Sequence, residues 1–118
     1  MLTTAEVGKL AEELAVGFLI RHRVRVLARN LNVGRGEIDV LVLIGGIRAV
    51  VEIRSLRQGR EWIDPISAFN ASKSRQVRGL AARVGARRVD LVTVSFSPAG
   101  VDLHWLPWAV SGVGAVHR

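Results

Sequence analysis

The chain has no cysteine, few acidic residues, almost no lysine and no long apolar run. The missing cysteines exclude disulfides and thiolate zinc sites, so any bound metal must use oxygen or imidazole ligands. Apolar runs such as 40–44 are far shorter than the roughly 20 residues of a membrane helix. No charged-then-apolar signal segment opens the chain. We therefore expect a soluble cytoplasmic protein without a membrane partner.

The charge balance is strongly basic. Seventeen basic residues stand against ten acidic ones, which gives a net charge of +7 and a pI near 11.6. Such a domain is expected to meet phosphate backbones, although a merely solubilising charge explains the balance about equally well. Only Lys9 and Lys73 are lysines, so 17 − 2 leaves 15 arginines. This skew is typical of GC-rich coding and weakens any inference from a single arginine.

The length bounds the number of domains. A chain of 118 residues with 49% hydrophobic content can bury one substantial core but not two. We expect a single domain over residues 1–110 and a flexible tail over 111–118.

Hydrophobic periodicity predicts two amphipathic helices and five strands. Thr3 or Thr4 is expected to cap the first helix and Ser72 the second, and Gly85 is a natural stop. The expected helices span 5–21 and 72–84, and the expected strands span 22–30, 36–44, 47–54, 89–96 and 101–106. Their connections include a loop at 55–64, a helical turn at 65–70 and a turn at 97–100.

A hairpin around Gly45-Gly46 is the most informative feature. If these glycines form the turn, the numbers of paired residues sum to 91, so Asp39 lies opposite Glu52. Directly opposed side chains have Cβ atoms roughly 4.5–5.5 Å apart. Two like charges at that distance repel, so a basic side chain or a divalent metal is expected to compensate them.

The same register places Glu37 opposite Arg54, and strand alternation puts all four side chains on one face. Three carboxylates and one guanidinium at the end of a hairpin could bind Mg²⁺, which takes one or two protein carboxylates plus waters and phosphate oxygens. The alternative is a cross-strand salt bridge between Glu37 and Arg54 beside a solvated pair.

Two motifs resemble those of a known family. The segments GEIDV at 36–40 and VVEIR at 50–54 resemble the GEID and VEVK signatures of the YraN family of uncharacterised bacterial proteins. The resemblance covers nearly the whole chain, from the helix with Glu12 to the segment AFNASK at 68–73. That family is similar to the restriction-endonuclease-like superfamily, which includes archaeal Holliday-junction resolvases. The resemblance implies an α/β fold with an αβββαβ core, in which helices flank a mixed sheet.

The resemblance also implies an activity. Members of that superfamily cut nucleic-acid phosphodiesters with a PD-(D/E)xK constellation. Carried over by position, Asp39 and Glu52 become metal ligands, and Glu12 becomes an accessory carboxylate that binds metal or a water. The metal polarises the scissile phosphate and lowers the pKa of a water. Lys73 becomes a phosphate contact, whereas for Glu12 alone a solvated helix flank is the alternative.

Arg54 departs from the family pattern, which has lysine at this position. A lysine beside two carboxylates can orient the attacking water, whereas a guanidinium stays charged with a pKa above about 12. Arg54 can stabilise negative charge but is a poor general base. The family's arginine two positions later is also absent, because Leu56 stands there. These departures bear on catalysis more than on binding.

A basic rim brackets the acidic hairpin in the sequence. We expect it to contact nucleic acid, with a solvated face as the alternative. The three tryptophans lack neighbouring basic clusters, so we expect Trp62, Trp105 and Trp108 to pack in the core or at a subunit interface more readily than to stack on bases. The candidate rim residues are Arg57, Arg60, Lys73, Arg75 and Arg78.

The sequence thus predicts a nucleic-acid-binding, nuclease-like protein with a Mg²⁺ or Mn²⁺ site, cutting structured or branched DNA. One alternative is a catalytically degenerate binding module in which Arg54 neutralises the carboxylates. Another is a structural adaptor whose charge is only solubilising. A homodimer suits an enzyme that cuts two strands symmetrically, and the oligomeric state stays open.

Overall fold

The computed structural model describes residues 2–57 and 71–110. The predictions for the remaining residues therefore lie outside the described part of the chain. They are most of the loop at 55–64, the helical turn at 65–70, the tail at 111–118, and the side chains of Arg60 and Trp62.

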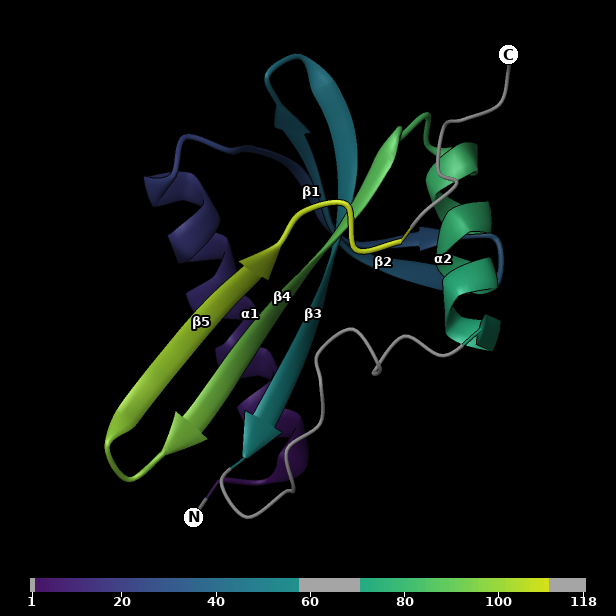
Figure 1. The fold of residues 1–118 in the computed structure, drawn as a ribbon. Coiled ribbons are helices and arrows are strands. Elements are labelled where there is room, and N and C mark those ends of the chain that lie inside the picture. Colours follow the sequence, from purple (N-terminus) through teal and green to yellow (C-terminus); the bar gives the residue numbers. More distant parts are fainter. Residues whose placement is uncertain (1, 58–70, 111–118) are drawn as a thin grey trace.

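The elements follow one another as helix, three strands, helix and two strands (Figure 1). One five-stranded sheet has the order β1-β2-β3-β4-β5, in which β3 and β4 run parallel and the other neighbours antiparallel. The predicted α/β fold with helices flanking a mixed sheet is confirmed, and β5 adds one strand to the predicted αβββαβ order. The elements are α1 (Thr4–Arg21), β1 (Arg25–Val33), β2 (Gly36–Ile44), β3 (Ile47–Arg57), α2 (Ala71–Arg83), β4 (Arg88–Ser97) and β5 (Gly100–Leu106).

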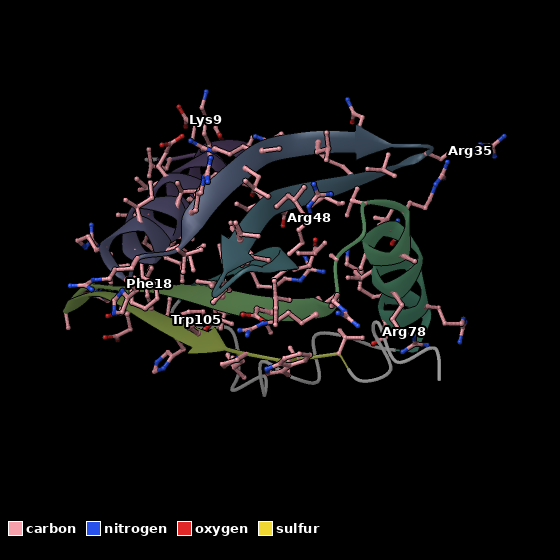
Figure 2. The ribbon with its side chains drawn as sticks, turned by 90° about the horizontal axis from the view of Figure 1, so that it is seen from above. Lys9, Phe18, Arg35, Arg48, Arg78 and Trp105 are labelled. Carbon is pink, nitrogen blue, oxygen red and sulfur yellow. The ribbon has the colours of Figure 1, made fainter. Side chains whose placement is uncertain are left out.

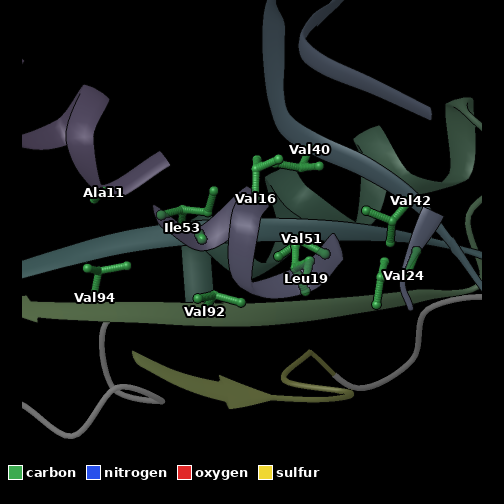
Figure 3. Close-up of a cluster of buried hydrophobic side chains, with 12 residues drawn as sticks. Ala11, Val16, Leu19, Val24, Val40, Val42, Val51, Ile53, Val92 and Val94 are labelled. Atoms are coloured by element: carbon green, nitrogen blue, oxygen red, sulfur yellow. The ribbon is translucent and has the colours of Figure 1, made fainter. Parts of the chain in front are cut away.

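The two helices cover opposite faces of the sheet. Along β3, Val51 and Ile53 belong to the core cluster under α1 (Figure 3), whereas Val50 belongs to the cluster under α2. This alternation follows from the strand period of two, which sends successive side chains to opposite faces. Leu41 of β2 lies in the same cluster as Val50, as the register predicts, but Ile38 lies there too, whereas Val40 belongs to the cluster under α1. The alternation along β2 is therefore broken between Ile38 and Val40, and the predicted shared face of Asp39 and Leu41 is not confirmed.

Helix α1 begins with a capping box. The Thr3 hydroxyl accepts the Glu6 N–H at 3.1 Å, and the Glu6 carboxylate accepts the Thr3 N–H at 2.8 Å. Of the two predicted caps, Thr3 is therefore the one that caps the helix. Within residues 2–57 and 71–110, no helix is long and apolar enough to cross a membrane.

Several predicted boundaries are wrong. Ser72 does not cap the second helix, because α2 already begins at Ala71, and the first strand runs over Arg25–Val33 and not over 22–30. His22 does not open the first strand, because it is the C-cap of α1, and its ring Nδ1 lies 2.8 Å from the Phe18 carbonyl oxygen. Strand β3 does not end at Arg54 but continues to Arg57, since residues 55–57 pair with β4. Polar sequence alone suggested a loop there, and the parallel partner supplies backbone hydrogen bonds that the sequence pattern does not show.

The Gly45-Gly46 turn sets the register as predicted. Both glycines have positive φ, 56° and 84°, as a tight hairpin turn of the primed type requires. The pairs run from Ile44–Ile47 to Val40–Val51, and each pair sums to 91. The ladder stops there, one pair short of Asp39 and Glu52.

Candidate metal and nucleic-acid site

Strands β2 and β3 separate at Asp39, and its carboxylate replaces the missing ladder bond. Its Oδ2 accepts the backbone N–H of Ile53 at 2.9 Å. Beyond this point, residues 36–38 pair with β1, and Glu37 lies opposite Asn32. The predicted opposition of Glu37 and Arg54 is therefore not formed, because the pairing of β2 with β3 ends at Val40–Val51, while the pairing of β2 with β1 continues to Gly36. The two strands make a fork, with Asp39 at its base.

A cleft of about 480 Å³ opens between this fork and the first turns of α1. It brings together Glu12, Asp39 and Arg54, which the sequence had selected. It also contains Lys9, which the sequence analysis did not select. Lys9 could have been predicted from the sequence, because it lies three residues before Glu12 and therefore on the same helix face. The cleft is lined by Ala5, Gly8, Lys9, Ala11, Glu12, Asn30, Asp39, Ile53, Arg54 and Ser55.

Glu12 is held by polar neighbours on β1. The Asn30 side-chain amide donates to its Oε1 at 3.3 Å, and the Arg29 guanidinium lies 3.8 Å from the same oxygen. Asn30 adopts a positive φ of 49°, a conformation that asparagine tolerates better than most residues. Arg29 pairs more closely with the exposed Glu13, at 2.7 Å. The Glu12 carboxylate is thus oriented at the cleft, not merely solvated.

Glu52 is almost fully buried, with 2% of its surface exposed. It extends from β3 toward α2, where the Lys73 Nζ lies 3.4 Å from its Oε1. Among the described residues, its Oε2 has no hydrogen-bond partner. Burial raises the pKa of the Glu52 carboxyl, and the negative charge of Asp39 raises it further, while Lys73 and Arg54 lower it. The Asp39 charge therefore acts on Glu52, as expected for neighbouring carboxylates.

The residues present fit a hard divalent cation. Asp39 and Glu52 offer carboxylate oxygens, and the partnerless Oε2 of Glu52 is an acceptor for which a cation or a proton is the natural partner. Mg²⁺ needs only one or two protein carboxylates when waters and phosphate oxygens complete its shell. In residues 2–57 and 71–110, however, no three acidic or histidine side chains gather closely enough to form a ready-made site. Glu12 thus shares the cleft with Asp39 without completing a preassembled triad.

Basic side chains gather on α2 and the neighbouring turn. Arg75 lines a groove together with Arg35 and Arg83, and Figure 2 shows Arg35 and Arg78 at the end of the molecule far from Lys9. Arg83 and Arg35 were not among the predicted rim residues. Arg83 could have been included, because it lies eight residues after Arg75 on the same helix face. Nothing in the sequence around Arg35 indicates that it reaches this groove. The Arg57 side chain is not described, so its predicted role is not tested.

The fold and the site define an α/β protein with two carboxylates where β2 and β3 separate. The model of the uncharacterised protein family UPF0102 matches residues 11–94, and the chain belongs to this family. This is the YraN-like family whose motifs the sequence resembles, so that resemblance is confirmed.

Relatives from distant bacteria agree with this assignment. A UPF0102 protein of Symbiobacterium thermophilum is 36% identical over 102 residues, covering 80% of this chain and 86% of that protein. One from Dictyoglomus turgidum is 30% identical over 112 residues, covering 88% and 94%. Among solved structures, SSO0001 superposes with a TM-score of 0.50 at 16% identity, over 88% of this chain and 52% of that one. This last similarity concerns the fold alone.

Proposed function

We propose that this protein binds nucleic acid and hydrolyses phosphodiesters in structured or branched DNA, with Mg²⁺ or Mn²⁺ held at Asp39 and Glu52. The observation that carries the proposal is the Glu52 carboxylate, buried beside Asp39 with one oxygen that has no partner among the described residues. A buried carboxylate in this state is costly unless a cation or proton compensates it. A divalent cation held there supplies Lewis acidity for phosphodiester hydrolysis.

Each neighbouring side chain has a distinct role in this proposal. Asp39 keeps Oδ2 on the Ile53 N–H, which fixes the carboxylate and leaves Oδ1 for the cation. Glu12 accepts a hydrogen bond from a water in the cleft and orients it. Arg54 stabilises negative charge on the phosphate through its guanidinium. Lys73 offsets the charge of Glu52 in the metal-free protein, and its ammonium would be available to contact the phosphate if Glu52 held a cation.

The distribution of lysine supports this proposal. The chain has only two lysines among its 17 basic residues. Lys9 lines the cleft, and Lys73 pairs with Glu52. An ammonium is a compact, strongly hydrated point charge with three donors, whereas a guanidinium is a planar fork. A chain that uses arginine almost everywhere else thus has its two ammonium groups at the proposed site.

The basic groove of Arg35, Arg75 and Arg83 is the proposed path of the phosphate backbone. Such binding should weaken steeply as salt concentration rises, because each neutralised phosphate releases counterions. We also propose that the protein is cytoplasmic, because it must have access to DNA. A homodimer would let two clefts cut two strands.

A catalytically degenerate binding module is the second candidate. Arg54 in place of the family lysine favours it, as does the absence of a third carboxylate gathered with Asp39 and Glu52 among the described residues. In that case the basic groove binds nucleic acid, and Lys73 and Arg54 simply offset the two carboxylates. Binding that survives EDTA, without cleavage, would distinguish this candidate from an enzyme.

The test is a calorimetric titration of Mn²⁺ into wild type and Asp39→Asn, beside cleavage assays on branched and linear DNA. Asparagine keeps a side-chain oxygen for the Ile53 N–H, so the fork is preserved while the charge is removed. We expect Mn²⁺ binding and cleavage in wild type, and the loss of both in Asp39→Asn. Glu13→Gln is the matched control, because Glu13 pairs with Arg29 and does not line the cleft.

Each other outcome has a definite meaning. If Mn²⁺ binds without cleavage, the binding module is favoured, and Arg54→Lys should then gain cleavage. If wild type binds no Mn²⁺, the carboxylate pair is structural and the nuclease proposal is wrong.

A further inference from the structure

A second buried carboxylate organises the far end of the sheet. Asp90 is fully buried on β4 and accepts four hydrogen bonds. Two come from the Arg88 guanidinium at 3.0 and 2.7 Å, one from the Trp105 indole N–H at 2.7 Å, and one from the backbone N–H of Trp108 at 3.0 Å. Asp90 thus fixes the segment that follows β5.

That segment is anchored on both sides of Trp108, yet the Trp108 side chain is turned outward. The Ala109 N–H donates to the Val89 carbonyl at 2.8 Å, and Val110 is buried in the cluster under α2. Trp108 itself is 55% exposed and adopts a φ of 55°. A bulky residue rarely adopts this left-handed conformation, so the backbone accepts strain in order to present this side chain.

Trp105 provides the contrast. It packs as predicted against the cluster under α1, with its ring 6.3 Å from that of Phe18 in an edge-on arrangement (Figure 2). Packing therefore accounts for Trp105 but leaves most of Trp108 unexplained.

One guanidinium lies against the ring of Trp108. The Arg88 guanidinium is 4.9 Å from the centroid of that ring, and the side chain of Arg88 is itself only 11% exposed. Two exposed arginines, Arg87 and Arg48, stand at the amino ends of β4 and β3, where the Arg87 N–H donates to the Arg48 carbonyl at 2.9 Å.

We propose that Trp108, supported by Arg88, is a stacking platform for an unpaired base of the nucleic acid. An exposed indole that lies against a guanidinium provides an aromatic face for a base, and the net charge of +7 supplies the positive charge that attracts the backbone. The occupant is therefore a single-stranded extension or branch, in preference to a second copy of the chain, because two copies that each carry +7 repel one another. This inference rests on the proposed nucleic-acid binding and specifies which part of the substrate is recognised.

The experiment compares a duplex that carries a short single-stranded extension with a blunt duplex of equal phosphate number, in EDTA to prevent cleavage. Trp108→Gly removes the ring and relieves the left-handed backbone, so the fold should be retained. We expect this variant to lose about tenfold in affinity for the extended DNA and less than about twofold for the blunt duplex. Trp108→Phe, which keeps a ring, should retain most of the preference, and binding of the extended DNA should quench the fluorescence of Trp108.

Val101→Ala is the matched control, because Val101 is another exposed apolar residue, 44% exposed at the start of β5, whereas Trp108 follows the end of that strand. Equal losses on both DNAs, or no loss, would overturn the stacking platform and leave the proposed function standing. If wild type binds neither DNA, the proposed function fails as well. If Trp108→Gly instead dissociates a dimer in sedimentation, the occupant is a second copy of the chain and this proposal is wrong.

Discussion

Glu52 and Asp90 are both buried carboxylates, but they differ in how they are satisfied. Asp90 accepts four hydrogen bonds, one pair on each oxygen. Glu52 has Lys73 at 3.4 Å on one oxygen, and within the described residues its other oxygen has no partner. A satisfied buried charge is what a structural role requires. Glu52, whose hydrogen-bonding capacity is not satisfied, is therefore the better candidate for a ligand-binding carboxylate.

This difference predicts that Glu52→Gln stabilises the metal-free protein at neutral pH. Burial and the Asp39 charge raise the pKa of Glu52 above the usual 4.5, so ionisation of this side chain opposes folding. The amide removes that charge, and Lys73, which is 28% exposed, can turn its ammonium to solvent. We expect a gain of about 1–2 kcal/mol in the free energy of unfolding, measured by urea denaturation in EDTA.

The pH dependence of that gain provides the control. Below pH 4.5 the wild-type carboxyl is protonated in both folded and unfolded states, so the two proteins should be nearly equally stable. As pH rises through the raised folded-state pKa, the wild type should lose stability relative to Glu52→Gln. A variant less stable than wild type at every pH would mean that the ion pair with Lys73 is a net stabilising contact.

Among the elements, α2 is positioned by a close approach to β2. A Cβ built on Gly36 would lie 2.8 and 3.0 Å from the two methyl carbons of Leu80, which is itself buried. Glycine at the start of the GEID motif is thus explained by helix packing. The same contact sets the distance between the sheet and the helix that carries Lys73 and Arg75.

Gly36→Ala is therefore expected to destabilise the fold by about 1–3 kcal/mol, because the added methyl overpacks this contact. Thermal and urea unfolding would measure the change. Gly79→Ala is the matched control, since a Cβ at Gly79, the residue before Leu80, meets nothing within 4 Å. That variant should gain up to about 1 kcal/mol from better helix propensity. Equal stability of Gly36→Ala and wild type would show that α2 can shift at no cost.

The sequence predicted what depends on local chemistry. The Gly45-Gly46 turn fixed the register of the hairpin, and the register brought Asp39 near Glu52. The end of the ladder at Val40–Val51 was not predictable, because it depends on the Asp39 carboxylate accepting the Ile53 backbone N–H. The groups around Arg83 and Trp108 come from segments far apart in the chain. Whether the carboxylates bind metal stays a prediction.

The parallel pairing of β3 with β4 has a kinetic consequence. The meander of β1, β2 and β3 is joined by short turns, whereas the connection from β3 to β4 spans residues 58–87. Closing the longer connection costs more entropy, so we expect β4 and α2 to dock late in folding. Glu52 would then become buried only after the transition state. Stopped-flow measurements should show that Glu52→Gln slows unfolding and leaves the refolding rate unchanged, whereas faster refolding would place this burial in the nucleus.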